Sequence, residues 1–304
     1  MRYLLLALLM MFNTANAALP NVSTGQIERL DNFSSEHVPA RNIDIWLPPS
    51  YDGKQKHAVL YMHDGQMLYD ADNTWNKQEW RVDEVAAELI AAGKTMPFIV
   101  VGIWNAGDNR HSEYFPQKPF ESLSPAQQQQ EYAKRRGETQ LLFSQKVYSD
   151  AYLKFLVTEL KPYIDSHYAV HSDREHTYVM GSSMGGLISM YALLEYPDIF
   201  EGAACLSTHW PGTLNDAENL IPNAFLSYMD KHLPMPAGHK IYFDYGTATL
   251  DALYPPLQAK VDRLIEEKGY SESLWQTLKF EGAEHSENAW AARLHKPLLF
   301  LLGK

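Results

Sequence analysis

The sequence predicts an α/β protein with one mostly parallel central sheet and helices on both faces. Three observations lead to this prediction. Short apolar runs of β-branched and aromatic residues recur along the chain, as in strands that are covered on both faces. Helical patterns separate these runs, which implies crossover connections between parallel strands. The composition of the 304 residues, 45% apolar and 21% charged, is that of a folded protein and excludes disordered, collagen-like and coiled-coil chains.

The predicted strands follow one another along the chain. The first, residues 43–47, alternates apolar and polar side chains and ends at Pro48, which is typical of a half-exposed edge strand. The helical pattern at residues 152–164 puts its apolar side chains on one face, and Pro162 should interrupt its last turn. A second helix covers residues 187–194. The later strands are expected at 58–62, 98–104, 177–180, 203–206, 241–245 and 274–280.

A polar insertion at residues 107–145 departs from this alternation. Ser124 followed by Pro125 is typical of a helix start, and Gly137 of a helix stop, so the segment should contain a short helix between polar loops. Insertions of this length in compact domains are either functional lids or surface additions, and both interpretations stay open.

The N-terminus has the pattern of a secretory signal peptide. Arg2 precedes an unbroken apolar run, residues 3–12, and Ala15-Asn16-Ala17 offers a cleavage site. Residues 1–17 are therefore expected to be a signal peptide and residues 18–304 one domain. The run is too short for a membrane helix, which needs about 20 residues. We expect a periplasmic or secreted protein without a membrane span.

Charge and cysteine content limit the partners and the chemistry. The formal net charge of −11 argues against a nucleic-acid partner, because such binding needs a surplus of Lys and Arg. Cys205 is the only cysteine, so no internal disulfide can form. Cys205 lies in an apolar strand pattern, where a small buried side chain is the simpler interpretation than a nucleophile.

The strongest motif is Gly-Ser-Ser-Met-Gly-Gly at residues 181–186. It follows a predicted strand and precedes a predicted helix, which is the context of a G-x-S-x-G nucleophile elbow. The sharp turn would raise the hydroxyl of its central residue above the carboxyl edge of the sheet. Ser183 is therefore the predicted nucleophile and Ser182 a turn residue.

A serine nucleophile needs an imidazole base, which a carboxylate usually orients. His285 follows the last predicted strand in a small, polar loop and is the predicted base. Asp251, beyond the strand at 241–245, is the predicted acid, with Asp244 as the reserve. Motif order alone does not separate these two carboxylates.

Two backbone N–H groups are expected to stabilise the oxyanion, those of Met184 and of Gln66 in the loop after strand 58–62. His63 and Asp64 in the same loop lack a further ligand at metal spacing. His171 and His176 are interpreted as solvated loop residues. The sequence predicts neither a metal nor a cofactor.

These residues resemble the "putative esterase" family of α/β-hydrolases, which includes enterochelin esterases, feruloyl and acetylxylan esterases, and S-formylglutathione hydrolases. The similar segments are residues 41–49, 61–66, 102–105, 160–163, 181–186 and 282–290. The resemblance implies an α/β-hydrolase fold, Ser183 as nucleophile, His285 as base, and the amides of Met184 and Gln66 as the oxyanion hole. Many members carry the acid where this chain has Thr249, and Asp251 lies two residues further on.

The predicted activity is hydrolysis of carboxylic esters through an acyl-serine intermediate, on acylated carbohydrates or aromatic acyl esters. Alternatives are a siderophore esterase of the enterochelin type, for which Arg110, Arg135 and Arg136 would supply positive charge, and a catalytically silent binding protein of the same fold. Flat indole faces suit sugars and aromatic acyl groups, although core packing is an equally good interpretation of each. The candidates for lining the substrate pocket are Asp64, Trp80, Asn105, Trp210 and Trp290.

Overall fold

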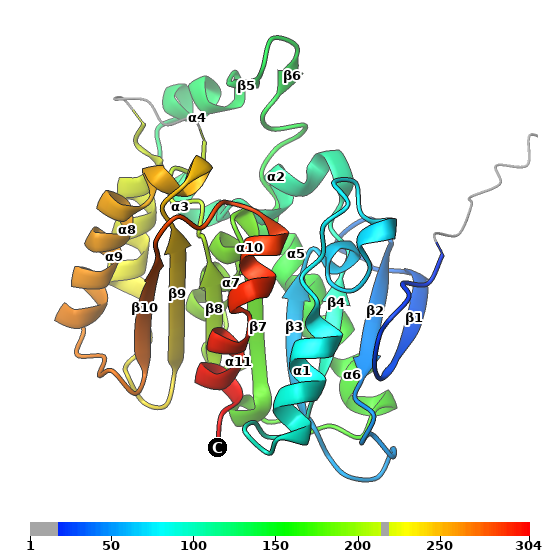
Figure 1. The fold of residues 1–304 in the computed structure, drawn as a ribbon. Coiled ribbons are helices and arrows are strands. Elements are labelled where there is room, and N and C mark those ends of the chain that lie inside the picture. Colours follow the sequence, from blue (N-terminus) through cyan, green and yellow to red (C-terminus); the bar gives the residue numbers. More distant parts are fainter. Residues whose placement is uncertain (1–17, 214–218) are drawn as a thin grey trace, which may run out of the picture.

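The computed structural model describes residues 18–213 and 219–304; the predicted signal peptide lies outside them. An eight-stranded sheet forms the centre of the molecule (Figure 1), in the order β1-β2-β4-β3-β7-β8-β9-β10. β1 and β2 are antiparallel to their neighbours, and β4, β3, β7, β8, β9 and β10 pair in parallel. The predicted fold class, a mostly parallel α/β sheet of the α/β-hydrolase type, is confirmed.

The sheet strands close to the predictions are β2 (Arg41–Leu47), β3 (Ala58–His63), β4 (Phe98–Ile103), β7 (Thr177–Ser182), β8 (Gly202–Leu206), β9 (Lys240–Gly246) and β10 (Trp275–Phe280). The edge prediction for β2 was wrong. β1 (Gln26–Phe33) pairs with β2 along that edge. Because polar residues interrupt its apolar positions, this strand was not predicted from the sequence. Arg29 of β1 pairs with Asp44 of β2 at 2.6 Å, so the polar positions of the two strands satisfy each other.

Helices cover both faces of the sheet, each over its own apolar core (Figure 1). One face carries α1 (Val82–Ala91), α10 (Glu287–Arg293) and α11 (His295–Leu302). The other carries α5 (Ser149–Phe155), α6 (Lys161–His167), α7 (Met184–Glu195), α8 (Ile221–His232) and α9 (Pro255–Glu267). Side chains alternate along β3, β7 and β9 between the two cores, as the pleat of a strand requires.

The predicted helix at 152–164 is longer than expected, and its interruption lies before Pro162, in the middle of the helical segment and not in the last turn as predicted. A π-helical turn, η4 (Leu156–Leu160), separates α5 from α6, and Pro162 lies in the first turn of α6. Proline lacks the N–H that would bond one turn back, so the regular ladder breaks before it.

The insertion at 107–145 contains α2 (Arg110–Tyr114), α3 (Gln117–Glu121), α4 (Pro125–Tyr132) and the short hairpin β5 (Arg135–Arg136) and β6 (Gln140–Leu141). Ser124 caps α4, as predicted, and the structure adds a capping box with Gln127. Gly137 does not end that helix. It turns the hairpin at φ 69°, a left-handed conformation that favours glycine. α4 and the hairpin project beyond the carboxyl edge of the sheet (Figure 1).

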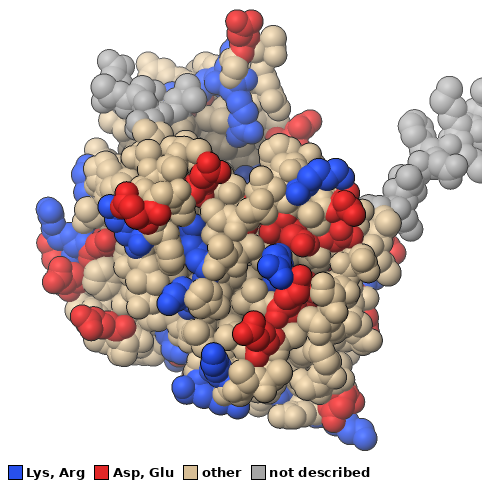
Figure 2. Space-filling model, in the orientation of Figure 1, with Lys and Arg blue, Asp and Glu red and all other residues tan. Residues whose placement is uncertain are grey.

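Acidic and basic side chains are interspersed over the described part of the face drawn in Figure 2, rather than separated into fields of one sign. Among the described residues, no helix combines the length and the apolar character that crossing a membrane requires.

Candidate active site

The motif at residues 181–186 forms a sharp turn between β7 and α7. Ser183 has φ 57° and ψ −118°, a strained conformation for a residue with a side chain. Its N–H donates to the carbonyl of Leu206 on the neighbouring strand β8 at 2.9 Å, which fixes the turn. A Cβ at Gly181 would lie 2.7 Å from the carbonyl oxygen of Gly185, so only glycine lets strand and helix approach this closely. The local geometry is that of a nucleophile elbow.

The structure brings Asp251 and His285 together across two loops at the carboxyl edge of the sheet. His285 Nδ1 lies 2.6 Å from Asp251 Oδ1. The other carboxylate oxygen, Oδ2, accepts hydrogen bonds from the Ser207 hydroxyl at 2.5 Å and from the Gly246 N–H at 2.6 Å. Burial alone would raise the pKa of Asp251, but the hydrogen bonds from His285 and Ser207 outweigh it and leave the pKa below its usual range. The carboxylate therefore stays ionised.

Asp244, the reserve acid, lies in a different environment. Its side chain is fully buried and accepts from Arg293 Nη2 at 2.9 Å and from the Tyr242 hydroxyl at 3.0 Å. Both carboxylate oxygens of Asp244 accept these hydrogen bonds, and neither bonds His285. Asp244 therefore belongs to a buried ion pair behind the site.

A hydrogen-bond network that was not predicted from the sequence joins the two carboxylates. The Ser207 hydroxyl, which donates to Asp251, accepts from Trp290 Nε1 and from Arg293 Nη2, both at 2.9 Å. Ser207 itself has φ 42°, so the chain bends sharply directly after β8. The network holds the Asp251 carboxylate from the side opposite His285, which makes Ser207 a candidate positioning residue.

Tyr254 is a second residue that sequence reasoning missed. Burial raises the pKa of its phenol well above the usual range, while a hydrogen bond with Ser183 acts in the opposite direction. The same hydroxyl lies 3.0 Å from His209 Nδ1. The Tyr254 and His285 rings approach edge to face at 5.9 Å. Tyr254 therefore connects the elbow, the predicted base and a second imidazole.

The loop after β3 packs directly against the elbow. A Cβ at Gly185 would lie 3.3 Å from Asp64 Oδ2 and 3.5 Å from His63 Cβ. Gln66 lies in the 3₁₀ turn η1 (Gly65–Met67), and Met184 is the first residue of α7. N–H groups in the first turn of a helix have no acceptor within that helix, which is the property that a candidate oxyanion donor needs.

Asp64 anchors the insertion to this loop. Arg110 binds its carboxylate with two bonds, of 2.6 and 2.7 Å, and Asn105 Nδ2 donates to it at 2.7 Å. Burial would raise the pKa of Asp64, but Arg110 beside it keeps the pKa below the usual range. Asp64 and Asn105, predicted as pocket residues, instead orient Arg110.

A cavity of about 340 Å³ opens over Ser183. Its wall combines apolar side chains with basic groups, and the insertion contributes Arg136 from the hairpin and Leu142 directly after it. The insertion is therefore part of the site. The remaining lining residues are Arg110, His111, Met184, His209, Pro211, Thr213, Leu250 and Leu253.

The three predicted pocket tryptophans are buried in the structure, which corrects that expectation. The exposed fractions of Trp80, Trp210 and Trp290 are 2%, 3% and 4%. Trp80 and Trp290 pack against each other at 5.4 Å, and Trp210 Nε1 donates to Gln258. Trp290 supports the site from behind, because its ring meets the His285 ring edge to face at 5.0 Å.

Residues 34–301 match the family model described as "Putative esterase". The chain belongs to this family. Membership supports hydrolysis of carboxylic esters as the class of reaction. The uncharacterised protein YbbA of Bacillus subtilis is 23% identical over 89% of this chain and 96% of its own length.

Two esterases are among the solved structures that share the fold. The ferulic acid esterase AmCE1/Fae1A from Anaeromyces mucronatus, solved with ferulic acid, has a TM-score of 0.62 at 17% identity over 94% of each chain. The enterobactin esterase FES from Shigella flexneri has a TM-score of 0.66 at 14% identity, over 93% of this chain and 60% of that one. At these identities the similarity is one of fold.

Proposed function

We propose that the protein is an exported serine esterase that hydrolyses small carboxylic esters through an acyl-serine intermediate. The observation that carries the proposal is the contact of 2.6 Å between Asp251 and His285, beside a cavity whose wall includes Ser183 at a strained elbow. Export follows from the predicted signal peptide at residues 1–17.

Acylation would begin with His285. Its Nδ1–H donates to the ionised Asp251, which leaves Nε2 unprotonated and able to accept the Ser183 proton. The Ser183 oxygen then attacks the ester carbonyl carbon and forms a tetrahedral intermediate. His285, now an imidazolium beside Asp251, returns the proton to the departing alcohol oxygen as the C–O bond breaks.

Deacylation would repeat these steps with water. His285 takes a proton from the water, which attacks the acyl-serine carbonyl, and returns the proton to Ser183 as the acid leaves. In both intermediates the Met184 and Gln66 N–H groups would bind the oxyanion. Each such donor contributes roughly 3–4 kcal/mol of barrier reduction in related enzymes.

The cavity supports a substrate with a compact, partly apolar acyl group. Leu142, Pro211, Leu250 and Leu253 give the wall apolar surface, and about 340 Å³ is at the lower end of the range for small-molecule sites. An aromatic acyl ester of the feruloyl type fits this description, and the neighbour from Anaeromyces mucronatus binds ferulic acid.

One observation favours a second candidate. Arg110 and Arg136 both reach the cavity wall, and guanidinium groups suit a substrate with anionic groups. A siderophore ester with catecholate oxygens has that character, and the neighbour from Shigella flexneri is an enterobactin esterase.

The test is a substrate panel with purified protein: methyl ferulate, an acetylated xylose, p-nitrophenyl acetate and an enterobactin-type trilactone. Ser183→Ala is the control, and a fluorophosphonate probe identifies the nucleophile by peptide mapping. The proposal expects hydrolysis that Ser183→Ala abolishes and label on Ser183 alone. Label on Ser182, or equal rates with Ser183→Ala, would overturn it, and binding without turnover would favour the silent binding protein.

A further inference from the structure

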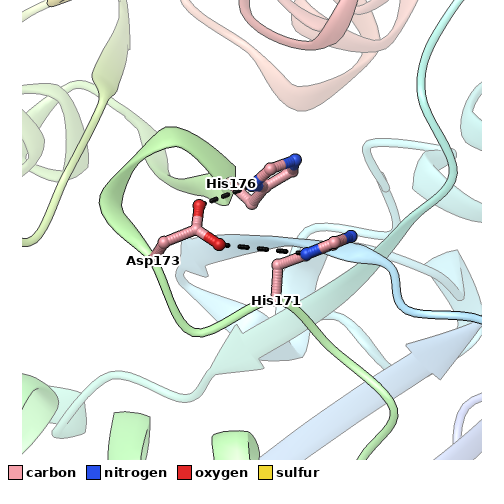
Figure 3. Close-up of side chains that lie close together, drawn as sticks. All are labelled: His171, Asp173 and His176. Carbon is pink, nitrogen blue, oxygen red and sulfur yellow. Dashed lines mark hydrogen bonds and ion pairs between the residues drawn. The ribbon is translucent and has the colours of Figure 1, made fainter.

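His171, Asp173 and His176 form a cluster of side chains (Figure 3). The cluster lies at the end of the sheet opposite Ser183. The segment lies between the end of α6 and the start of β7, where His176 ends the 3₁₀ turn η5 (Arg174–His176). Ser183 follows the other end of β7, and six strand residues at about 3.3 Å each separate the two positions by roughly 20 Å. The cluster is therefore independent of the catalytic residues.

The three side chains turn their ligating atoms toward one another. His176 Nδ1 lies 2.5 Å from Asp173 Oδ1, and His171 Nδ1 lies 3.8 Å from Asp173 Oδ2. Figure 3 shows the carboxylate beside the two stacked imidazoles, with one ring nitrogen of each directed at it. One ligating atom from each residue lies within 4.8 Å of the other two. The imidazole rings are nearly parallel, with centroids 4.0 Å apart.

The backbone holds the three positions in place without a ligand. The His171 N–H donates to the carbonyl of His57 at 2.9 Å, which ties this segment to the start of β3. The carbonyl of Asp173 accepts from the Thr177 hydroxyl at 2.8 Å and from the His176 N–H at 3.4 Å. The cluster is thus built on a fixed turn, while its side chains remain partly exposed and able to adjust.

We infer that His171, Asp173 and His176 bind one divalent transition-metal ion, of the Zn²⁺, Ni²⁺ or Cu²⁺ class. Two imidazole nitrogens and one carboxylate oxygen are a donor set that these ions prefer over Mg²⁺ or Ca²⁺, which favour oxygen ligands. Tetrahedral coordination at about 2.1 Å requires ligand atoms about 3.4 Å apart. The Asp173 contacts of 2.5 and 3.8 Å go to different carboxylate oxygens, and the two rings are nearly parallel, so side-chain rotation must bring one atom of each residue onto the ion.

This inference replaces the expectation that His171 and His176 are merely solvated and that the protein binds no metal. The spacing His-x-Asp-x-x-His gave a weak signal, because the residues lie neither on one regular helix nor on one strand. The 3₁₀ turn brings His176 back to His171. With three protein ligands and an exposed position, water would complete the coordination. The ion would join the three side chains of the segment before β7. It would stabilise the folded protein, because it would bind the folded state and not the unfolded one.

The test is isothermal titration of the full chain, purified without a histidine tag, with ZnCl₂ and separately with NiCl₂ at pH 7.5. His171→Phe keeps the ring that stacks on His176 but removes both nitrogens, and Asp173→Asn keeps the shape of the carboxylate. The matched control is His232→Phe, because His232 is an exposed histidine stacked on Tyr228 at 4.1 Å without a second imidazole.

We expect one equivalent of Zn²⁺ or Ni²⁺ bound by the wild type and by His232→Phe. His171→Phe and Asp173→Asn should bind at least about tenfold more weakly, since even lost outer-sphere partners of metal ligands cost that much. Saturating Zn²⁺ should raise the melting temperature of the wild type but not of these two variants. Hydrolysis of p-nitrophenyl acetate, measured before the metal is added, confirms that each variant is folded.

Equal affinity in the wild type and in both cluster variants would overturn the inference. So would loss of binding in His232→Phe or uptake of several equivalents without saturation, because these indicate binding to scattered surface histidines. Tighter binding of Ca²⁺ than of Zn²⁺ would also overturn it, since the nitrogen ligands would then play no part.

Discussion

Replacing Asp251 by Asn should disable catalysis through the wrong tautomer of His285. Two donors, the Ser207 hydroxyl and the Gly246 N–H, face Oδ2 of the native carboxylate. In Asp251→Asn the amide oxygen must turn toward these donors, which leaves the amide NH₂ facing His285 Nδ1. That nitrogen must then accept, so the imidazole proton moves to Nε2, the atom that has to take the proton of Ser183.

The expected loss in kcat is about 10⁴-fold, the value known for the same substitution in the Ser-His-Asp template. This equals roughly 5.4 kcal/mol of barrier. KM should change little, because Asp251 is buried behind His285 and does not line the cavity. The assay is kcat and KM for p-nitrophenyl acetate, with circular dichroism to verify folding.

Asp244→Asn is the matched control, because Asp244 is equally buried but is bound to Arg293. Removing one charge of a buried pair costs about 3–5 kcal/mol, and we expect the lower end because the amide oxygen still accepts from Arg293. That corresponds to a melting temperature lower by about 5–10 °C, with kcat within a fewfold of the wild type. Asp251→Asn with more than about a tenth of the native kcat, or a folded Asp244→Asn that is equally inactive, would refute this reasoning.

Three further predictions concern Ser207, Gly246 and His63. Ser207→Ala removes a donor to Asp251 and leaves the buried Trp290 N–H unpaired, which costs about 1–3 kcal/mol. We expect kcat to fall about 10–100-fold while KM stays constant. An unchanged kcat would exclude a positioning role for Ser207. Gly246→Ala would place a Cβ 2.1 Å from the Ala283 carbonyl oxygen, so activity should fall through displacement of the His285 loop, and wild-type steady-state rates would contradict this. Burial lowers the pKa of His63 to about 3, so below pH 6.5 the unfolded state binds a proton that the folded state does not. Stability should therefore fall as the pH drops from 6.5 toward 3, by up to about 1.4 kcal/mol per pH unit from this residue. Urea unfolding at pH 7.5 and 5.0 measures the loss, which should be smaller in His63→Gln; an equal loss in that variant would assign the effect to other groups.

The parallel strands were predictable because each is covered on both faces. β3, β4, β7 and β8 are buried along their whole length, and such strands leave continuous apolar runs in the sequence. β1 was not predictable in this way. It lies at the edge of the sheet, and its polar side chains find partners such as Asp44 only in the folded state.

The tryptophans show where residue type misleads. An indole serves a sugar face and a protein core equally well, and the sequence does not say which surface it meets. In the structure Trp80 and Trp290 fill the core behind His285, while Arg136, on a polar insertion, reaches the cavity. Basic residues of the insertion were thus better indicators of the cavity wall than the aromatic residues.

Which carboxylate contacts His285 depends on backbone geometry that residue order does not reveal. Thr249 stands where relatives were expected to carry the carboxylate, and it has φ 53°, so the chain turns sharply there. Its hydroxyl accepts the N–H of His285 at 2.9 Å, which fixes the histidine loop, while η6 (Thr249–Leu253) carries Asp251 back beneath the imidazole. Gly246 allows this return, because any side chain there would meet Ala283 and the carboxylate itself. A glycine, a strained threonine and the 3₁₀ helix η6 together place Asp251, two residues beyond Thr249, with its oxygen 2.6 Å from His285 Nδ1.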